Sequence, residues 1–227
     1  YRRLRDAVEP VAVRLGTTIV WTPGNHDDRA ALRAGLFDGA DGSGGSEYAP
    51  LCFVRWFGSL RVVSLDSTVP GAHWGALDQG RLDWLQEVLS ERAPDGTLLL
   101  MHHAPLPTVL DLAVTVELRG QQELAAVLRG SDVRAILSGH VHHPSFGTFA
   151  GVPVAIASSS AYGQDLTVEA GGTRGQDAAQ GWNLVQVHDD TVVHSVVSLD
   201  RGLAVGELVS PADVSRRLAA QGIRWRE

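Results

Sequence analysis

Residues 97–105 read TLLLMHHAP, an apolar run that turns abruptly into two histidines. An uncharged run of this length is typical of a strand buried on both faces. The same pattern occurs where strand-like residues 17–21 precede GNHD at 24–27, and where residues 135–138 precede GHVHH at 139–143. Because the carboxyl ends of parallel strands meet at one edge of an open α/β sheet, we expect the three polar motifs to converge there.

Histidine and asparagine delivered from three strands to one edge are typical of a metal site. Neutral imidazole suits Zn, Fe and Cu ions, whereas an amide or carboxylate oxygen suits harder ions. His140 and His142 alternate along the chain, so both rings can face one cavity. Gly139 before them permits a sharp turn. Each motif alone is a weak signal, but the three together, in this order, are a strong one.

The rest of the chain alternates between strand-like and helical patterns and predicts one layered α/β domain over residues 1–227, with a C-terminal half that is mostly β. Glycine-rich segments predict loops at 39–46 and 170–180. We expect helices at residues 1–15, 29–37, 79–91, 121–128 and 211–220. We expect strands at residues 17–21, 51–57, 60–66, 97–101, 135–138, 146–149, 152–157, 182–188, 191–199 and 203–209.

Composition excludes several classes of function. A net charge of -7 and a pI of about 5.7 argue against a nucleic-acid binder, which needs a basic surface. A small phosphorylated substrate remains open, because bound metal ions supply positive charge locally. No apolar run reaches the roughly 18 residues of a membrane helix. Cys52 is the only cysteine, so a disulfide within the chain is impossible, which is consistent with a reducing cytoplasm.

The set GNHD, HH followed closely by proline, and GHxH resembles the calcineurin-like metallophosphoesterase family over nearly the whole chain. The resemblance is closest at residues 101–120 (MHHAPLPTVLDLAVTVELRG) and 161–181 (AYGQDLTVEAGGTRGQDAAQG). Both stretches look like those of mycobacterial class III 3′,5′-cyclic-nucleotide phosphodiesterases. The resemblance implies an α/β fold in which a β-sandwich is flanked by helices, in four layers α/β/β/α.

By position, the resemblance implies that Asn25, His102 and His140 bind the second of two metal ions and that His142 binds the first. His26 would contact the phosphate and protonate the leaving group. The two ions would be divalent or mixed-valence, and the ligand types admit Fe, Mn, Zn or Co.

Three further residues are candidates for contacts with the substrate or for orienting a ligand or the general acid. Asp27 follows the general-acid candidate directly, and His103 lies beside a metal ligand. Asp66 ends a predicted strand, so a role as a cap is at least as well founded.

The implied reaction is hydrolysis of cAMP or cGMP to the 5′-nucleotide. The resemblance also implies a homodimer. Its expected location is the cytoplasm, with peripheral attachment to the membrane or envelope as an alternative. One alternative is the same chemistry on another phosphoester, such as a 2′,3′-cyclic nucleotide. Another is a catalytically inactive binding module. Family members also carry D-x-H and GDxxD, which supply the remaining ligands, and neither occurs in this sequence. We therefore expect a chain truncated at its N-terminus, without the first strands and with little activity alone.

Overall fold

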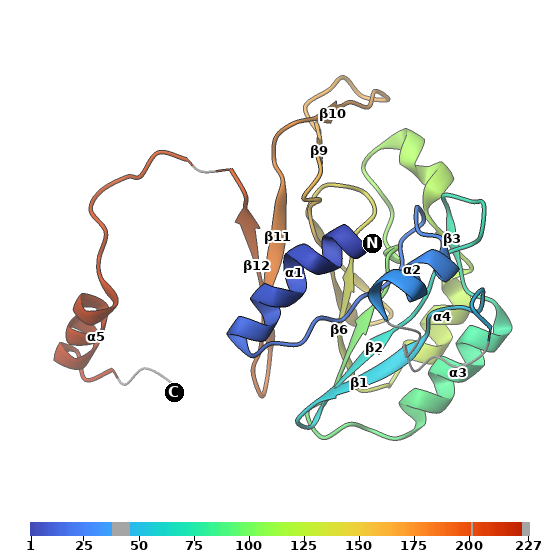
Figure 1. Cartoon of the computed structure of the whole chain (residues 1–227), viewed down its shortest axis with the longest axis horizontal. Helices are drawn as coiled ribbons and strands as arrows, with labels where there is room; N and C mark the ends of the chain where they lie inside the picture. The colour runs from blue at the N-terminus through green and yellow to red at the C-terminus, as the bar shows by residue number, and fades with distance from the viewer. Residues whose placement is uncertain (38–45, 201, 224–227) are drawn as a thin grey trace.

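The computed structural model describes residues 1–37, 46–200 and 202–223, and its centre is a six-stranded sheet in the order β1-β2-β4-β6-β8-β7 (Figure 1). β2, β4, β6 and β8 are parallel, and β1 and β7 run antiparallel at the two edges. The predicted loop at 39–46 lies, except for its last residue, outside the described residues. The strands are β1 Phe53–Phe57, β2 Leu60–Ser64, β4 Thr97–Leu100, β6 Val133–Ser138, β7 Ser145–Phe149 and β8 Val152–Ile156.

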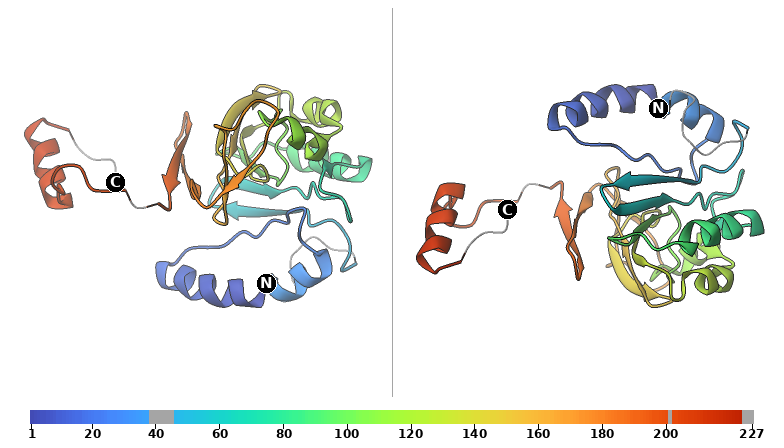
Figure 2. Two further views of the ribbon diagram at one scale, coloured as in Figure 1. Left: turned by 90° about the horizontal axis from the view of Figure 1, so that it is seen from above. Right: turned by 90° about the horizontal axis from the view of Figure 1, so that it is seen from below.

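Helices cover both faces of this sheet. α1 (Arg2–Leu15) and α2 (Arg29–Leu36) lie on one side of β1 and β2, and α3 (Gln79–Ser90) and α4 (Gln121–Leu128) lie on the other (Figure 2). The leucines of α3 recur three and four residues apart, so they form one stripe that packs on the sheet. The main core under α3 and α4 includes Leu82, Leu85, Leu89, Leu124, Leu128, Val63, Leu99 and Ile136.

Alternate residues of the same strands form the opposite face. Val62, Leu98 and Ala135 are neighbours across β2, β4 and β6, and they pack against Val187 and Val192. These two valines belong to a hairpin of β11 (Gly181–Val187) and β12 (Val192–Ser198). The predicted α/β fold with flanking helices is confirmed, and the hairpin forms a two-stranded sheet of its own that packs on this face of the main sheet.

Short elements complete the described chain. Two pairs of two-residue strands join loops near the carboxyl edge of the main sheet, and one of them places β10 inside the loop predicted at 170–180. These elements are β3 Gly75–Ala76, β5 Leu118–Arg119, β9 Gly163–Gln164, β10 Gly175–Gln176, the 3₁₀ helix η1 Asp111–Val116 and α5 Pro211–Ala220.

Two predicted strands are wrong. Residues 17–21 and 203–209 form no strand, although both are rich in β-branched or apolar residues. Leu203 and Val205 are 97% and 100% exposed. A strand requires a neighbouring chain that accepts and donates its backbone hydrogen bonds, and neither segment has one among the described residues.

The amino ends of the sheet strands are tied together by a buried ion pair. Arg61 of β2 bonds both carboxylate oxygens of Asp132, at 2.9 and 3.0 Å, and the hydroxyl of Thr97 at 2.8 Å. The two charged side chains are 5% and 6% exposed. Arg61 is the second residue of β2, and Thr97 is the first residue of β4. The ion pair therefore lies at the end of the strands opposite to the histidine motifs.

α5 is set apart from the rest of the molecule in Figure 1 and buries none of its residues. Ser210 caps its first turn, and Pro211 occupies its first position. Across the described residues, none of the helices combines the length and apolar character needed to span a bilayer.

Candidate metal centre

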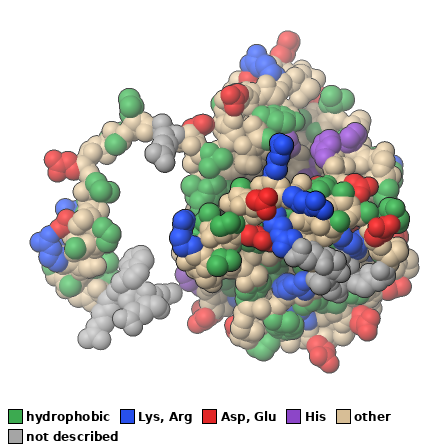
Figure 3. All heavy atoms as spheres, in the orientation of Figure 1, with side chains coloured by type: hydrophobic (Ala, Val, Ile, Leu, Met, Phe, Trp, Pro, Cys, Tyr) green, Lys and Arg blue, Asp and Glu red, His purple; other side chains and the backbone are tan. Residues whose placement is uncertain are grey.

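The three polar motifs meet at the carboxyl edge of the main sheet, as predicted. His102 follows β4, His140 follows β6, and Asn25 comes from the loop before α2. Asn25 Oδ1 lies 2.8 Å from His102 Nε2 and 3.2 Å from His140 Nδ1, and these two nitrogens are 3.2 Å apart. In Figure 3, histidine side chains gather in one patch at the upper right of the face shown.

The spacing of these three atoms fits a common metal ion. Ligand atoms at about 2.1 Å from one ion, and at right angles to each other, are about 3.0 Å apart. The Nε2 atom of His140 donates to the Val116 carbonyl at 3.0 Å, which leaves its Nδ1 lone pair directed at Asn25 and His102. A carbonyl that fixes the tautomer of a ligating imidazole is a common feature of metal sites.

His142 lies next to this cluster. Its Nδ1 atom is buried and has no hydrogen-bond partner in the part of the chain that the structure describes, which fits a lone pair available to a ligand. The φ angles of His140 and His142 are 77° and 58°, an uncommon conformation for residues with side chains and one that is concentrated at functional sites. The ring of His142 lies 4.3 Å from that of Tyr162.

His103 is fully buried, and both of its ring nitrogens have partners. Its Nδ1 atom lies 2.9 Å from the Ser67 hydroxyl, and its Nε2 atom lies 3.1 Å from the His73 carbonyl. The ring also lies 4.4 Å from that of His140. His103 therefore supports the loop that carries His73, and its nitrogens are not free to bind an ion, although they lie close to those of His102 and His140.

Burial keeps these imidazoles neutral. It lowers the pKa of His102 to about 3, with a further contribution from the neighbouring histidines, and lowers the pKa of His103 to about 4. Burial also lowers the pKa of His140 and of His142. Only a neutral imidazole has a lone pair for a metal ion, so at neutral pH these side chains are in the state that metal binding requires.

His26, the predicted general acid, is exposed at the rim of the cluster. Its ring lies 5.3 Å from that of His73, a residue of the loop between β2 and β3. The amide nitrogen of Asn25 donates to His73 Nδ1 at 3.2 Å, which turns Asn25 Oδ1 toward the other ligand candidates. His73 belongs to none of the three sequence motifs, and only the folded loop brings it beside Asn25.

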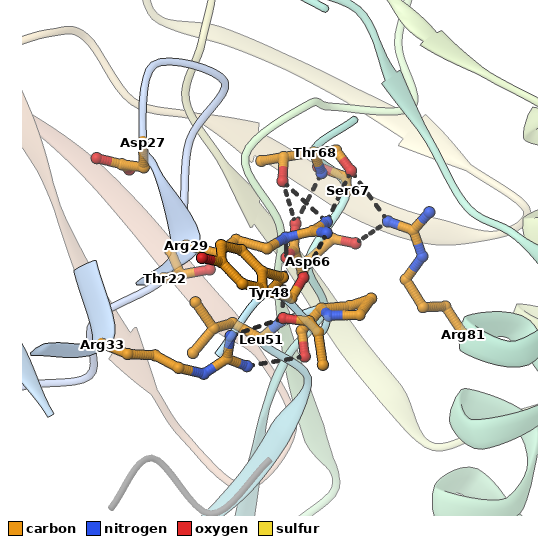
Figure 4. Close-up of polar contacts among 12 residues, drawn as sticks. Thr22, Asp27, Arg29, Arg33, Tyr48, Leu51, Asp66, Ser67, Thr68 and Arg81 are labelled. Carbon is orange, nitrogen blue, oxygen red and sulfur yellow. Dashed lines mark hydrogen bonds and ion pairs between the residues drawn. The ribbon is translucent and has the colours of Figure 1, made fainter. Parts of the chain in front are cut away.

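The carboxylates of Asp27 and Asp66 both accept hydrogen bonds from groups other than the histidines. Asp27 closes its own turn by accepting from the Gly24 amide at 2.7 Å, and it accepts from the Tyr1 hydroxyl at 2.9 Å. Asp66 binds backbone and side-chain groups around the end of β2 (Figure 4). Within the described part of the chain neither carboxylate bonds to His26, so the capping alternative describes the observed contacts of Asp66 better than direct orientation of the general acid.

A cavity of about 340 Å³ lies beside the imidazoles of His140 and His142. Small-molecule sites have volumes of about 300–1,000 Å³ and combine apolar walls with a few polar groups. This cavity has that character. Its other lining residues are Leu110, Leu112, Ala113, Thr115, Val116, Val141, Tyr162, Gln164 and Thr173.

Comparison with known proteins gives a consistent picture. A family model described as calcineurin-like phosphoesterase matches residues 2–144. A "cAMP/cGMP dual specificity phosphodiesterase" of Mycobacterium tuberculosis is 55% identical over 98% of this chain and 69% of its own length. A "Probable cyclic nucleotide phosphodiesterase" of Rhodococcus erythropolis is 52% identical over the whole chain and 74% of its own length. A "3′,5′-cyclic adenosine monophosphate phosphodiesterase" of Escherichia coli K12 is 36% identical over 54% of the chain and 42% of its own length.

Proposed function

The chain belongs to the calcineurin-like phosphoesterase family, and from this premise we propose that it hydrolyses 3′,5′-cyclic nucleotides to 5′-nucleotides at a centre of two metal ions. The observation that carries the proposal is the cluster of Asn25 Oδ1, His102 Nε2 and His140 Nδ1, whose mutual distances of 2.8–3.2 Å fit ligands of one ion. The substrate class is supported by the names of the most similar relatives. The family itself implies divalent metal ions.

Four side chains would hold the ions in this proposal. Asn25, His102 and His140 would bind one ion, and His142, with its unpartnered Nδ1 atom, would contribute to the other. Bound metal ions lower the pKa of water toward about 7 and neutralise charge on phosphate oxygens.

The chain's own groups have defined tasks in the proposed reaction. His26 at the rim would carry a proton and donate it to the departing O3′ of the nucleotide, a contribution of about 10²–10⁴ in rate for a well-placed acid. Burial keeps His102 and His140 neutral, so that they bind and do not donate protons. His103 would hold the His73 loop in place and exclude water from behind the cluster.

We propose Mn²⁺ or Fe as the bound ions. Zn and Co are the alternatives, because imidazole and amide ligands accept all four metals. The metal content of the purified protein, measured by elemental analysis after loading and desalting, decides between them. One ion per chain that is lost in Asn25→Ala would assign the three-atom cluster to a single site. Two ions per chain would require ligands beyond the four named.

Relative rates on three substrates test the reaction. Because neither D-x-H nor GDxxD occurs in this sequence, we expect low absolute rates from this chain alone, with cAMP hydrolysed faster than 2′,3′-cyclic AMP and bis-p-nitrophenyl phosphate by the metal-loaded protein. Equal or greater rates on the other two compounds would favour a broader phosphodiesterase. No hydrolysis of any of them, together with measurable nucleotide binding, would favour a binding module. His140→Ala serves as the inactive control, because it removes a proposed ligand.

Assembly and location complete the proposal. We propose a homodimer located in the cytoplasm, on the basis of the resemblance to class III cyclic-nucleotide phosphodiesterases. Sedimentation of the protein as a monomer at micromolar concentration would contradict the dimer. Recovery in the membrane fraction of a cell extract would contradict the simple cytoplasmic location.

A further inference from the structure

The loop that carries Asn25 and His26 is linked to the main sheet through side chains and not through its backbone; one link is the Ser64 hydroxyl at the end of β2, which donates to the Thr22 hydroxyl at 3.0 Å. Among the described residues, 18–23 make no backbone-to-backbone hydrogen bond to a strand, and the bonds between Gly24 and Asp27 are internal to the motif. His102 and His140, by contrast, follow strands in the middle of the parallel ladder. A centre that combines one loop residue with two sheet residues needs another contact that fixes the loop relative to the sheet.

Arg29 provides such a contact. It is the first residue of α2, two residues after the GNHD motif, and its side chain reaches the end of β2 (Figure 4). Its Nε atom donates to Asp66 Oδ2 at 2.8 Å. Its Nη2 atom donates to the Thr68 carbonyl at 3.1 Å and to the Thr68 hydroxyl at 3.2 Å, and its Nη1 atom donates to the Tyr48 carbonyl at 3.3 Å.

The partner of Arg29 is itself rigidly fixed. Asp66 is fully buried, and its Oδ2 atom also accepts from the Leu51 amide at 3.0 Å. Its Oδ1 atom accepts from the amide and hydroxyl of Thr68, at 2.8 and 2.6 Å. Arg81 of α3 donates to the Asp66 carbonyl at 2.7 Å. The carboxylate therefore joins the end of β2, the start of α2 and the segment before β1.

The motif loop also lies directly against a ligand candidate. A Cβ atom at Gly24 would lie 3.0 Å from the nearest atom of the His102 ring, a tight contact, so the loop backbone passes close to this ring. At this distance a small displacement of α2 would either press Gly24 into His102 or draw Asn25 Oδ1 away from it. A contact that fixes the start of α2 would therefore also fix the distance between Asn25 Oδ1 and His102 Nε2.

We propose that Arg29 is a positioning residue that holds Asn25 and His26 over the carboxyl edge of the sheet through its bonds to Asp66 and Thr68. The inference rests on the proposed metal centre and names the contact that assembles it. Arg29 acts through the loop and binds neither the ion nor the substrate. Partners that orient metal ligands typically change metal affinity by about 10–100-fold when they are altered.

The test is Mn²⁺ binding to the Arg29→Lys variant, measured by the electron paramagnetic resonance of free Mn²⁺ in a titration. Lysine retains the charge beside Asp66 but lacks the planar set of donors that reaches Asp66 and Thr68 together. We expect the Kd for Mn²⁺ to rise at least about tenfold. A thermal unfolding curve of the variant checks that it is folded at the temperature of the titration.

Arg61→Lys is the matched control. It makes the same change in a similarly buried ion pair, with side chains 5% and 6% exposed against 10% and 0% for Arg29 and Asp66, but this pair lies at the amino ends of the strands. We expect it to lower the unfolding temperature similarly and to change the Kd by less than about twofold, since it touches none of the residues that support the loop. Equal changes in Kd for the two variants, or no change for Arg29→Lys, would overturn the proposal.

Thr68→Val provides a second variant if Arg29→Lys does not fold. It removes the hydroxyl that bridges Asp66 and Arg29 and retains the backbone bonds and the side-chain volume. A rise in the Kd for Mn²⁺ supports the proposal, and an unchanged Kd refutes it. An unaltered protein that binds none of Mn²⁺, Fe²⁺, Zn²⁺ and Co²⁺ would refute the metal centre itself, and this inference with it.

Discussion

At the scale of single residues, the candidate centre depends on lone pairs that no other contact uses. The carbonyl of Val116 occupies one nitrogen of His140 and leaves the other free, whereas both nitrogens of His103 are occupied. Two adjacent histidines, His102 and His103, thus differ in function because of their hydrogen-bond partners. In the sequence, only the resemblance to the phosphoesterase family identifies His102, and not His103, as a metal ligand.

We expect His140→Ala to lower the affinity for Mn²⁺ at least about 100-fold, because the loss of a ligand should exceed the loss of a group that only orients one. Isothermal titration of the purified protein measures the change. His188→Ala is the control, since His188 lies at the turn between β11 and β12, and its side chain is not part of the cluster. Equal affinities for the two variants would remove His140 from the ligand set.

Cys52 gives a second prediction at this scale. Burial raises the pKa of its thiol to about 11. Because only the thiolate reacts, alkylation by iodoacetamide at pH 8 should be at least about 100-fold slower in the folded protein than in guanidinium chloride. Mass spectrometry of timed samples measures both rates. Comparable rates in the two states would show that the thiol is accessible and ionised.

At the scale of elements, α3 is held to the sheet by one stripe of leucines. Leu85 is fully buried and lies in the main core with Leu99 and Ile136. We expect Leu85→Ala to reduce the free energy of unfolding by about 2–5 kcal/mol, through lost burial and the cavity left behind. Urea denaturation followed by circular dichroism measures the loss. Gln86→Ala, on the exposed side of α3, should change stability by less than about 0.5 kcal/mol.

α5 contrasts with α3, because it buries no residue. A helix of 10 residues is shorter than the roughly 12–15 at which isolated helices become stable in water, even with a serine cap and a proline at its start. We expect its amides to exchange with deuterium within seconds at pH 7, while those of β4 remain protected for hours or longer. Hydrogen exchange with mass spectrometry tests this. Protection of α5 as strong as that of β4 would mean that α5 packs against a surface.

At the scale of the whole molecule, the buried histidines couple stability to pH. The pKa of His102 is lowered to about 3 and that of His103 to about 4, below the ordinary value of 6.5 that applies in the unfolded chain. Between about pH 6.5 and pH 4 the unfolded state therefore binds more protons than the folded state. In that window the stability of the metal-free protein falls as the pH falls.

The expected slope is about 1.4 kcal/mol per pH unit for each of the two histidines once the pH is well below 6.5. Urea denaturation of metal-free protein at pH 7, 6, 5 and 4.5 measures it, with near-constant stability expected above pH 7 from these groups. Replacement of His103 by asparagine should reduce the slope by about 1.4 kcal/mol per pH unit, the share of one histidine. A stability that stays constant down to pH 4.5 would contradict the neutral state of the cluster.

The sequence alone determined the fold class and the members of the cluster. Uncharged runs such as 97–101 and 135–138 predict buried strands from local composition, and each is followed at once by its polar motif, so the meeting of His102 and His140 follows from a parallel sheet. Asn25 was placed with them by the same argument from a strand at residues 17–21, which does not form, so the folded loop and not a strand brings Asn25 to the cluster.

The tertiary structure alone decided which contacts assemble and support the centre. Arg29 and Asp66 are 37 residues apart, and Asn25 and His73 are 48 apart, so no periodicity or local pattern links them. The same reason explains the two wrong strands: whether an apolar segment forms a strand depends on a partner elsewhere in the chain. Composition and spacing fix what a segment tends to form, whereas hydrogen-bond partners and burial are properties of the folded chain.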